Sequence, residues 1–115
     1  MKQLKCLLFL VVFSFPAIVF ADLTGKWSCN DGGTYYMRQL GKEVFWMGER
    51  APTNPSWSNT ASGYLDGNQI ILRWADVPKG QIMSEGILIL RLDNPNRATA
   101  TYKTGGFGGS VWTRP

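Results

Sequence analysis

Short runs of β-branched and aromatic residues recur along this chain every eight to twelve residues, separated by clusters of Gly, Asn, Asp and Pro. This spacing is typical of an antiparallel sandwich or barrel, and no stretch keeps the apolar period of a helix. The sequence therefore predicts an all-β fold. The predicted strands cover residues 24–29, 33–40, 43–50, 57–65, 68–75, 85–92, 97–103 and 110–114.

The connections between these segments determine how the strands pair. Residues 66–67 are Asp-Gly, a two-residue turn that tolerates positive φ, and residues 93–96 read Asp-Asn-Pro-Asn, a polar turn. No connection is long enough for a crossover, so each strand is expected to pair with the next one. Closing such a sheet removes both unpaired edges. We therefore expect an eight-stranded antiparallel up-and-down barrel.

Successive connections of an up-and-down barrel alternate between its two ends. The second, fourth and sixth connections are tight, at residues 41–42, 66–67 and 93–96. The first, third, fifth and seventh are long or rich in Gly and Pro, at residues 30–33, 51–56, 76–84 and 104–109. Because functional groups favour loops held on a rigid scaffold, we expect any site at the end with these four irregular connections, called the odd-loop end below.

The alternation of apolar and polar residues predicts which side chains face the interior. In the fifth and seventh predicted strands, the residues that share one face are Ile70, Leu72, Trp74, Ala98, Ala100 and Tyr102. By contrast, 44–47 and 87–90 are apolar on both faces. Their outer faces are expected to be covered by a loop, a terminus or another chain, and a homodimer is one such arrangement.

The N-terminal segment predicts export. Two lysines in the first five residues precede an apolar run over 6–20, and 19–21 supply a small-residue cleavage pattern. The run is shorter than the roughly 20 residues that a membrane span needs. We therefore expect a cleaved signal peptide over 1–21, a single β-barrel domain over 22–115 without a membrane span, and a periplasmic or secreted location. A retained anchor is the alternative.

Charge and composition disfavour several functional classes. Cleavage would remove two of the 12 basic residues, which leaves ten against eight acidic ones and a net charge of +2. This charge is too small and too evenly spread to indicate nucleic acid as a partner. The chain has no histidine, the commonest general base and metal ligand. We therefore expect no enzymatic activity, no metal and no cofactor.

Cleavage would also leave Cys29 as the sole cysteine, so no intramolecular disulfide is expected. Cys29 lies two residues after Trp27 and shares its face of the first predicted strand. A buried thiol is therefore favoured, with an intermolecular disulfide as the alternative.

Aromatic and polar residues gather near the odd-loop end. An aromatic rim with a few polar groups suits a small-molecule site, because stacking supplies affinity and hydrogen bonds supply orientation. The candidate ligand-binding residues on this ground are Tyr36, Trp46, Trp57, Trp74 and Asp76. A barrel of about eight strands is only just wide enough for its own side chains. Core packing is therefore favoured for Trp27, Trp74 and Trp112, and a shallow mouth is expected in place of a deep cavity.

Asp76 ends the fifth predicted strand on the face of Trp74. An inward carboxylate requires a partner, and the candidates are Arg38 and backbone amides of its own loop. A structural turn or a buried pair is the alternative to ligand contact.

Residues 104–110 read Thr-Gly-Gly-Phe-Gly-Gly-Ser. Phosphate-binding glycine loops open a helix, whereas this segment precedes a strand. Phe107 is therefore expected to plug the end of the barrel, and an exposed anchor for a partner is the alternative.

Three segments carry a resemblance to a known family. They are NDGGTYY followed by RQ within 30–39, WADVPKG at 74–80, and TGGFGGS with a following tryptophan at 104–112. On these motifs the chain resembles an uncharacterised family of small exported bacterial β-barrel proteins over nearly all of the mature chain. The resemblance implies no particular activity.

The opening of the mature chain carries a weaker resemblance. Residues 23–27 read LTGKW, and their Gly-x-Trp is similar to the first strand of the calycin barrels, the lipocalins and avidins. With the Asn and Thr that follow, the segment looks like the opening of an avidin, where such residues hydrogen-bond the ureido group of biotin. The resemblance implies a lipocalin-like barrel and a biotin-binding role for Asn30 and Thr34.

The leading functional hypothesis is a non-enzymatic exported barrel that binds a small hydrophobic or amphiphilic ligand at the odd-loop end. The rival hypothesis is a periplasmic barrel that binds a protein target, such as a lysozyme or protease, by inserting the loops at 51–56 and 104–109. An avidin-like biotin binder is a weaker alternative.

Overall fold

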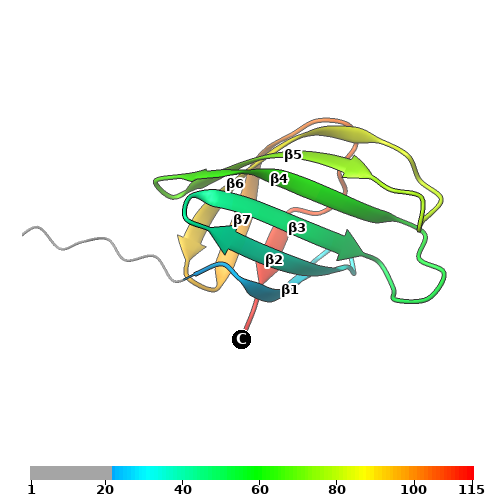
Figure 1. Ribbon diagram of the computed structural model, residues 1–115, viewed down its shortest axis with the longest axis horizontal. Helices are drawn as coiled ribbons and strands as arrows, with labels where there is room; N and C mark the ends of the chain where they lie inside the picture. Colours follow the sequence, from blue (N-terminus) through cyan, green and yellow to red (C-terminus); the bar gives the residue numbers. More distant parts are fainter. Residues whose placement is uncertain (1–21) are drawn as a thin grey trace, which may run out of the picture.

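Eight strands close into one barrel in which every strand pairs with its neighbours in chain order (Figure 1). The structure is a computed structural model that describes residues 22–115, so the signal peptide predicted over 1–21 lies outside the described residues. The strands are β1 (Gly25–Cys29), β2 (Thr34–Leu40), β3 (Glu43–Glu49), β4 (Ser58–Asp66), β5 (Gln69–Asp76), β6 (Glu85–Asn94), β7 (Arg97–Lys103) and β8 (Val111–Thr113). The predicted eight-stranded antiparallel up-and-down barrel is confirmed. Residues 22–115 include no helix long and apolar enough to cross a membrane.

The barrel closes where β8 pairs with β1. The ladder there is short, with Ser28 opposite Thr113 and Cys29 opposite Trp112. Side chains extend it: the Asn30 side-chain oxygen accepts hydrogen bonds from the backbone amides of Ser110 and Val111.

The C-terminal Arg114 reinforces the same seam from the opposite end. Its guanidinium donates to the backbone oxygens of Asp22, Thr24 and Pro95, and it lies 4.5 Å above the Trp27 ring. The two chain ends of the domain are thereby joined to each other and to the β6–β7 turn.

The two ends of the barrel differ as the loop parity predicts. Tight turns at 41–42, 67–68 and 95–96 lie at one end, and Gly41 and Gly67 adopt positive φ there. The connections at 30–33, 50–57, 77–84 and 104–110 lie at the other end, on the right of Figure 1. All of the irregular backbone between strands therefore meets at the odd-loop end.

Side chains fill the interior of the barrel. Trp27, Trp74 and Trp112 are 1%, 3% and 0% exposed and belong to one cluster of buried apolar residues. The core-packing interpretation of these tryptophans is confirmed. Ile70 and Leu72 are also buried, as the alternation in β5 predicts.

The position predicted for Tyr102 is wrong. Ala98 is buried, but Tyr102 is 52% exposed. Between these residues the pairing of β7 with β6 shifts, because Ala100 lies opposite Leu90 while Tyr102 lies opposite Ile89. A β-bulge adds one residue to a strand, so the alternation reverses beyond it and Tyr102 points outward.

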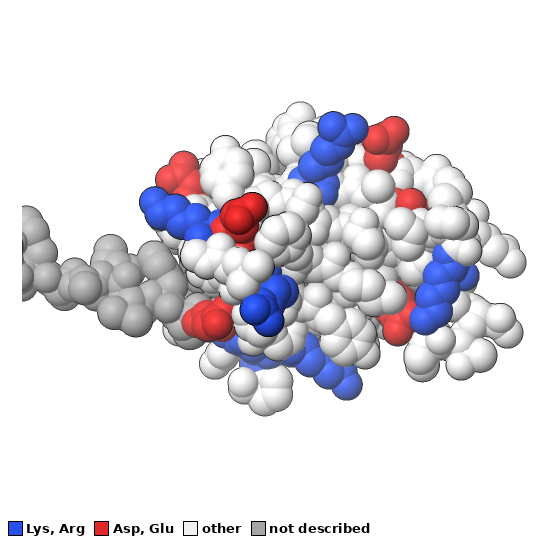
Figure 2. Space-filling model, viewed as in Figure 1, with Lys and Arg blue, Asp and Glu red and all other residues white. Residues whose placement is uncertain are grey.

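The outer surface retains exposed apolar side chains. Phe45 and Ile87, on the strands that are apolar on both faces, are 38% and 39% exposed, and Tyr64 is 50% exposed. No loop or terminus within 22–115 covers them. Figure 2 shows Lys and Arg interspersed with Asp and Glu on the face in view, with uncharged areas between them. The homodimer therefore stays a prediction.

Two isoleucine variants test the inward and outward assignment. Ile70→Ala removes a side chain that is 1% exposed, so it should lower the free energy of unfolding by about 2–4 kcal/mol through lost burial and the cavity left behind. Ile87→Ala, on the outer face, should cost less than about 1 kcal/mol. Urea denaturation of both variants measures the difference, and equal losses would contradict the assignment.

Candidate functional site

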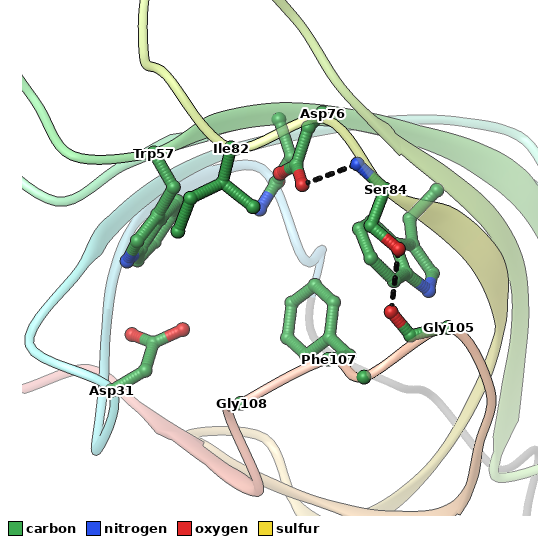
Figure 3. Close-up of a pocket in the computed structure, with 11 residues that line it drawn as sticks. Asp31, Trp57, Asp76, Ile82, Ser84, Gly105, Phe107 and Gly108 are labelled. Carbon is green, nitrogen blue, oxygen red and sulfur yellow. Dashed lines mark hydrogen bonds between the residues drawn. The ribbon is translucent and has the colours of Figure 1, made fainter.

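A cleft of about 260 Å³ opens at the odd-loop end (Figure 3). Each of the four odd connections contributes to its walls. Asp31 comes from the β1–β2 connection, Trp57 from β3–β4, Ile82 and Ser84 from β5–β6, and Phe107 from β7–β8. The cleft therefore depends on the meeting of all four loops.

The ends of β4 and β5 supply the rest of the polar and aromatic wall. Asn59 and Asp76 are register partners on these strands, and both line the cleft together with Trp74. The Trp74 indole nitrogen donates to the Thr104 carbonyl oxygen at 3.2 Å. This bond ties the wall formed by β5 to the glycine-rich loop.

Asp76 is held by its own loop. The Ser84 amide donates to Asp76 Oδ2 at 2.9 Å, and the Asp76 amide donates to the Ser84 carbonyl oxygen at 2.8 Å. The sequence predicts either Arg38 or a backbone amide of the loop as the partner of Asp76. The partner is the loop amide of Ser84, because Arg38 is exposed on the outer face of β2. Partial burial raises the pKa of Asp76 above its ordinary value, and the Ser84 hydrogen bond offsets part of that rise.

Phe107 forms the floor of the cleft and is 7% exposed. Its ring packs edge-on against Trp74 with centroids 4.9 Å apart, and it lies 5.8 Å from the Trp112 ring. The predicted plug is therefore confirmed. The loop reaches this position through Gly105, which has a φ of 80° and where a Cβ would collide with the Glu85 carbonyl oxygen. Only glycine meets both conditions without strain.

A polar layer supports the cleft from below. The Tyr35 hydroxyl donates to Asp31 Oδ2 at 2.6 Å, and the Gly33 amide donates to Asp31 Oδ1 at 2.8 Å. Burial raises the pKa of the Tyr35 hydroxyl far above its ordinary value, so Tyr35 stays a hydrogen-bond donor. These two bonds fix the Asp31 carboxylate at the edge of the cleft.

An ion pair holds the β5–β6 loop against β3. Lys79 Nζ lies 2.6 Å from Glu49 Oε1, and the Glu49 side chain is only 8% exposed. Removal of one partner would leave a buried charge unpaired. Lys79 therefore holds the β5–β6 loop in place and does not line the cleft.

Four of the candidate ligand-binding residues belong to the cleft or lie next to it. Trp57, Trp74 and Asp76 line it. Trp46 lies one layer deeper and is 4% exposed, and its indole nitrogen donates to Asn59 Oδ1 at 2.9 Å. Trp46 therefore orients a residue of the wall and does not face the opening.

The other three candidates lie away from the cleft. The Asn30 side chain is occupied by the seam of the barrel. Thr34 begins β2 and pairs with Glu49. Tyr36 is 47% exposed on the outer face, because Tyr35 takes the inward position. The arrangement implied by the avidin resemblance is thus not part of this cleft.

Three further wall residues, Asp31, Asn59 and Ser84, are not among the candidates predicted from the sequence. Asn59 carried a usable signal, because alternation places it on the same face as Ala61 and Leu65, where a polar side chain is out of place. Asp31 precedes a Gly by two residues, the spacing of an Asx turn. No pattern in the sequence indicates Ser84, whose position depends on how the β5–β6 loop folds back.

The cleft offers aromatic rings, two carboxylates, one amide and one hydroxyl. Within residues 22–115, no group of three or more Cys, Asp or Glu side chains is placed to hold a metal ion. Cys29 is free, buried and 8% exposed, and burial raises its pKa to about 12. The cleft therefore combines aromatic surface with polar groups, and Asp31, Asp76, Asn59 and Ser84 are held in place by hydrogen bonds.

The state of Cys29 is open to a chemical test. Because the thiolate is the reactive form, the mature protein should react with iodoacetamide at pH 8 at least about a hundredfold more slowly when folded than in guanidinium chloride. Mass spectrometry of timed samples measures both rates. Equal rates, or a disulfide-linked dimer in the absence of reductant, would contradict the buried thiol.

A pH series tests the environment of Asp76. A carboxyl whose pKa is higher in the folded state loses folding free energy as pH rises from its ordinary value of 3.8 through the raised value. Asp76→Asn removes this loss and keeps an oxygen that can accept from Ser84. The variant should therefore unfold at a higher temperature than the wild type at pH 7, and this gain should vanish below about pH 3.

Thermal unfolding followed by circular dichroism measures the gain at each pH. Asp66→Asn, at the exposed end of β4 on the opposite side of the barrel, controls for the change in net charge. A lower unfolding temperature for Asp76→Asn at pH 7 would show that the Asp76 charge stabilises the fold.

Comparisons of the chain with protein-family models, with curated proteins and with solved structures found no match. The cleft itself is therefore the basis on which a function is proposed.

Proposed function

We propose that this chain is an exported, non-enzymatic, lipocalin-like barrel that binds a small hydrophobic or amphiphilic molecule at the odd-loop end. The observation that carries the proposal is the cleft in which Trp57, Trp74 and Phe107 meet fixed polar groups on a closed and filled barrel. Ligand sites are concave, mostly apolar and supplied with a few placed polar groups. The cleft has each of these properties.

The size of the cleft limits the ligand. A volume of about 260 Å³ lies just below the roughly 300–1,000 Å³ of typical ligand sites. The interior beneath it is occupied by Phe107, Trp112 and the rest of the core. The ligand is therefore small and lies at the mouth, unlike a long acyl chain that needs a hollow barrel.

The composition of the walls favours an amphiphilic ligand over a purely apolar one. Trp57, Ile82 and Phe107 supply apolar contact, while Asp76 and Asn59 supply hydrogen-bonding groups. A wholly apolar ligand would remove water from these polar groups without replacing its hydrogen bonds, which is costly.

We propose binding without catalysis because the side chains that most often act as a general base or a nucleophile are absent or buried. The chain has no histidine, and its thiol in the described part is buried with a raised pKa. Export to the periplasm or the medium is proposed from the sequence of residues 1–21, and a homodimer from the exposed apolar side chains of the outer face.

A barrel that inhibits a lysozyme or protease is the second candidate. It is favoured by the β3–β4 connection, where Pro52, Thr53 and Asn54 are all exposed and Asn54 has a φ of 47°. The other loop expected to enter a target has Phe107 buried in the core. One protruding loop supports this candidate less than four convergent loops support the first.

The fluorescent probe N-phenyl-1-naphthylamine tests ligand binding by the mature protein. Its emission should rise on binding, and Trp57→Ala should weaken binding by about fivefold through loss of ring contact. Tyr64→Ala removes an exposed aromatic ring from the outer face and should leave binding unchanged. No emission change, or equal losses in both variants, would overturn the proposal. Biotin added as a competitor tests the avidin-like alternative.

A further inference from the structure

We infer that the ligand of the cleft is a small organic cation, such as a substituted ammonium ion, held between aromatic rings and the carboxylates of Asp31 and Asp76. This inference rests on the proposed function and gives the charge of the ligand that the cleft accepts.

The charge around the cleft is negative. Asp31 and Asp76 are the charged residues among those that line it, and no Lys or Arg is among them. Figure 3 shows the two carboxylates on different sides of the opening, Asp76 at the top and Asp31 at the lower left, with the Phe107 ring below Asp76 and to the right of Asp31. An anionic group placed there would meet like charge from both sides, whereas a cation would meet opposite charge from both.

Neither carboxylate has a cationic side chain as its partner in the described part of the chain. Four ion pairs form within residues 22–115, and none includes Asp31 or Asp76. Lys79 pairs with Glu49, and Lys103 donates to the Gly109 carbonyl oxygen and the Ser110 hydroxyl. Arg50 reaches Asp31 only at its backbone oxygen, at 3.4 Å. No cationic side chain of the described domain is therefore paired with either carboxylate of the cleft.

The two aspartate side chains can accept further hydrogen bonds. Asp76 Oδ2 accepts from the Ser84 amide, and Asp76 Oδ1 has no hydrogen-bond partner among the described residues. Each oxygen of Asp31 accepts one bond, and a carboxylate oxygen can accept two. Partial burial also raises the pKa of Asp76, so a bound cation would offset a cost that the free protein bears.

Three aromatic side chains, Trp57, Trp74 and Phe107, line the cleft together with the two carboxylates. The faces of aromatic rings attract cations, tryptophan most strongly, and quaternary ammonium groups are bound in proteins by such rings. Rings together with carboxylates suit an ammonium group better than a neutral alkyl group of the same shape.

Three matched phenols test the inference by isothermal titration calorimetry on the mature protein. 4-(Trimethylammonio)phenol is cationic, 4-tert-butylphenol is its neutral counterpart of nearly equal shape, and 4-hydroxybenzenesulfonate is anionic. The cation should bind about tenfold more tightly than the neutral compound, and the sulfonate should bind more weakly than both. This comparison needs no variant.

Variants then assign the effect to the cleft. Asp76→Asn should weaken binding of the cation by about tenfold and leave 4-tert-butylphenol unaffected. Asp66→Asn, at the exposed end of β4 on the opposite side of the barrel, should change neither affinity. Loss of cation binding in both variants would show that net charge alone is responsible and would overturn the inference.

The remaining outcomes separate this inference from the proposed function. If the neutral phenol binds as tightly as the cation, and Trp57→Ala weakens both, the cationic ligand is overturned while the ligand-binding cleft stands. If none of the three phenols binds and N-phenyl-1-naphthylamine gives no response, the inference and the proposed function both fail.

Discussion

Closure of the sheet in chain order is the constraint on which the rest of this molecule depends. The ladder between β1 and β8 is short, so the seam relies on side chains. Asn30 joins it at the odd-loop end and Arg114 at the other. Because the strands are paired in sequence, every second connection returns to the same end, and four irregular loops converge there. The position of the cleft therefore follows from the order in which the strands pair, and not from any single residue.

The interior of the barrel determines what that convergence can build. Tryptophans fill the space between the strands, and Phe107 covers them from the glycine-rich loop. The cleft above has a rigid floor, because Phe107 is in contact with rings that belong to three different strands. Hydrogen bonds from Tyr35 to Asp31 and from Trp46 to Asn59 connect these two wall residues to buried side chains of the core and so fix their positions. The packing of the core therefore also determines the geometry of the cleft.

The sequence predicted the topology because local signals agreed with one another. Alternation placed Ile70 and Leu72 inside, turn chemistry placed the hairpins, and loop parity placed Asp76 near Phe107. The sequence-based predictions were wrong where tertiary structure overrides local patterns such as the alternation of inward and outward side chains. A bulge in β7 turns Tyr102 outward. The adjacent Tyr35 and Tyr36 alternate, so that Tyr35 takes the inward position and the predicted candidate Tyr36 lies outside. Ser84 reaches the cleft only because the β5–β6 loop folds back on Asp76, which no period in the sequence encodes.

The filled interior has a kinetic consequence. Proteins that enclose a ligand within a hollow barrel release it slowly, since strands or lids must part first. Here Phe107 is buried beneath the cleft, so a ligand of the kind proposed above would stay at the mouth, with one side in water, and would leave without any opening of the sheet. For that proposed ligand, the arrangement predicts short residence times.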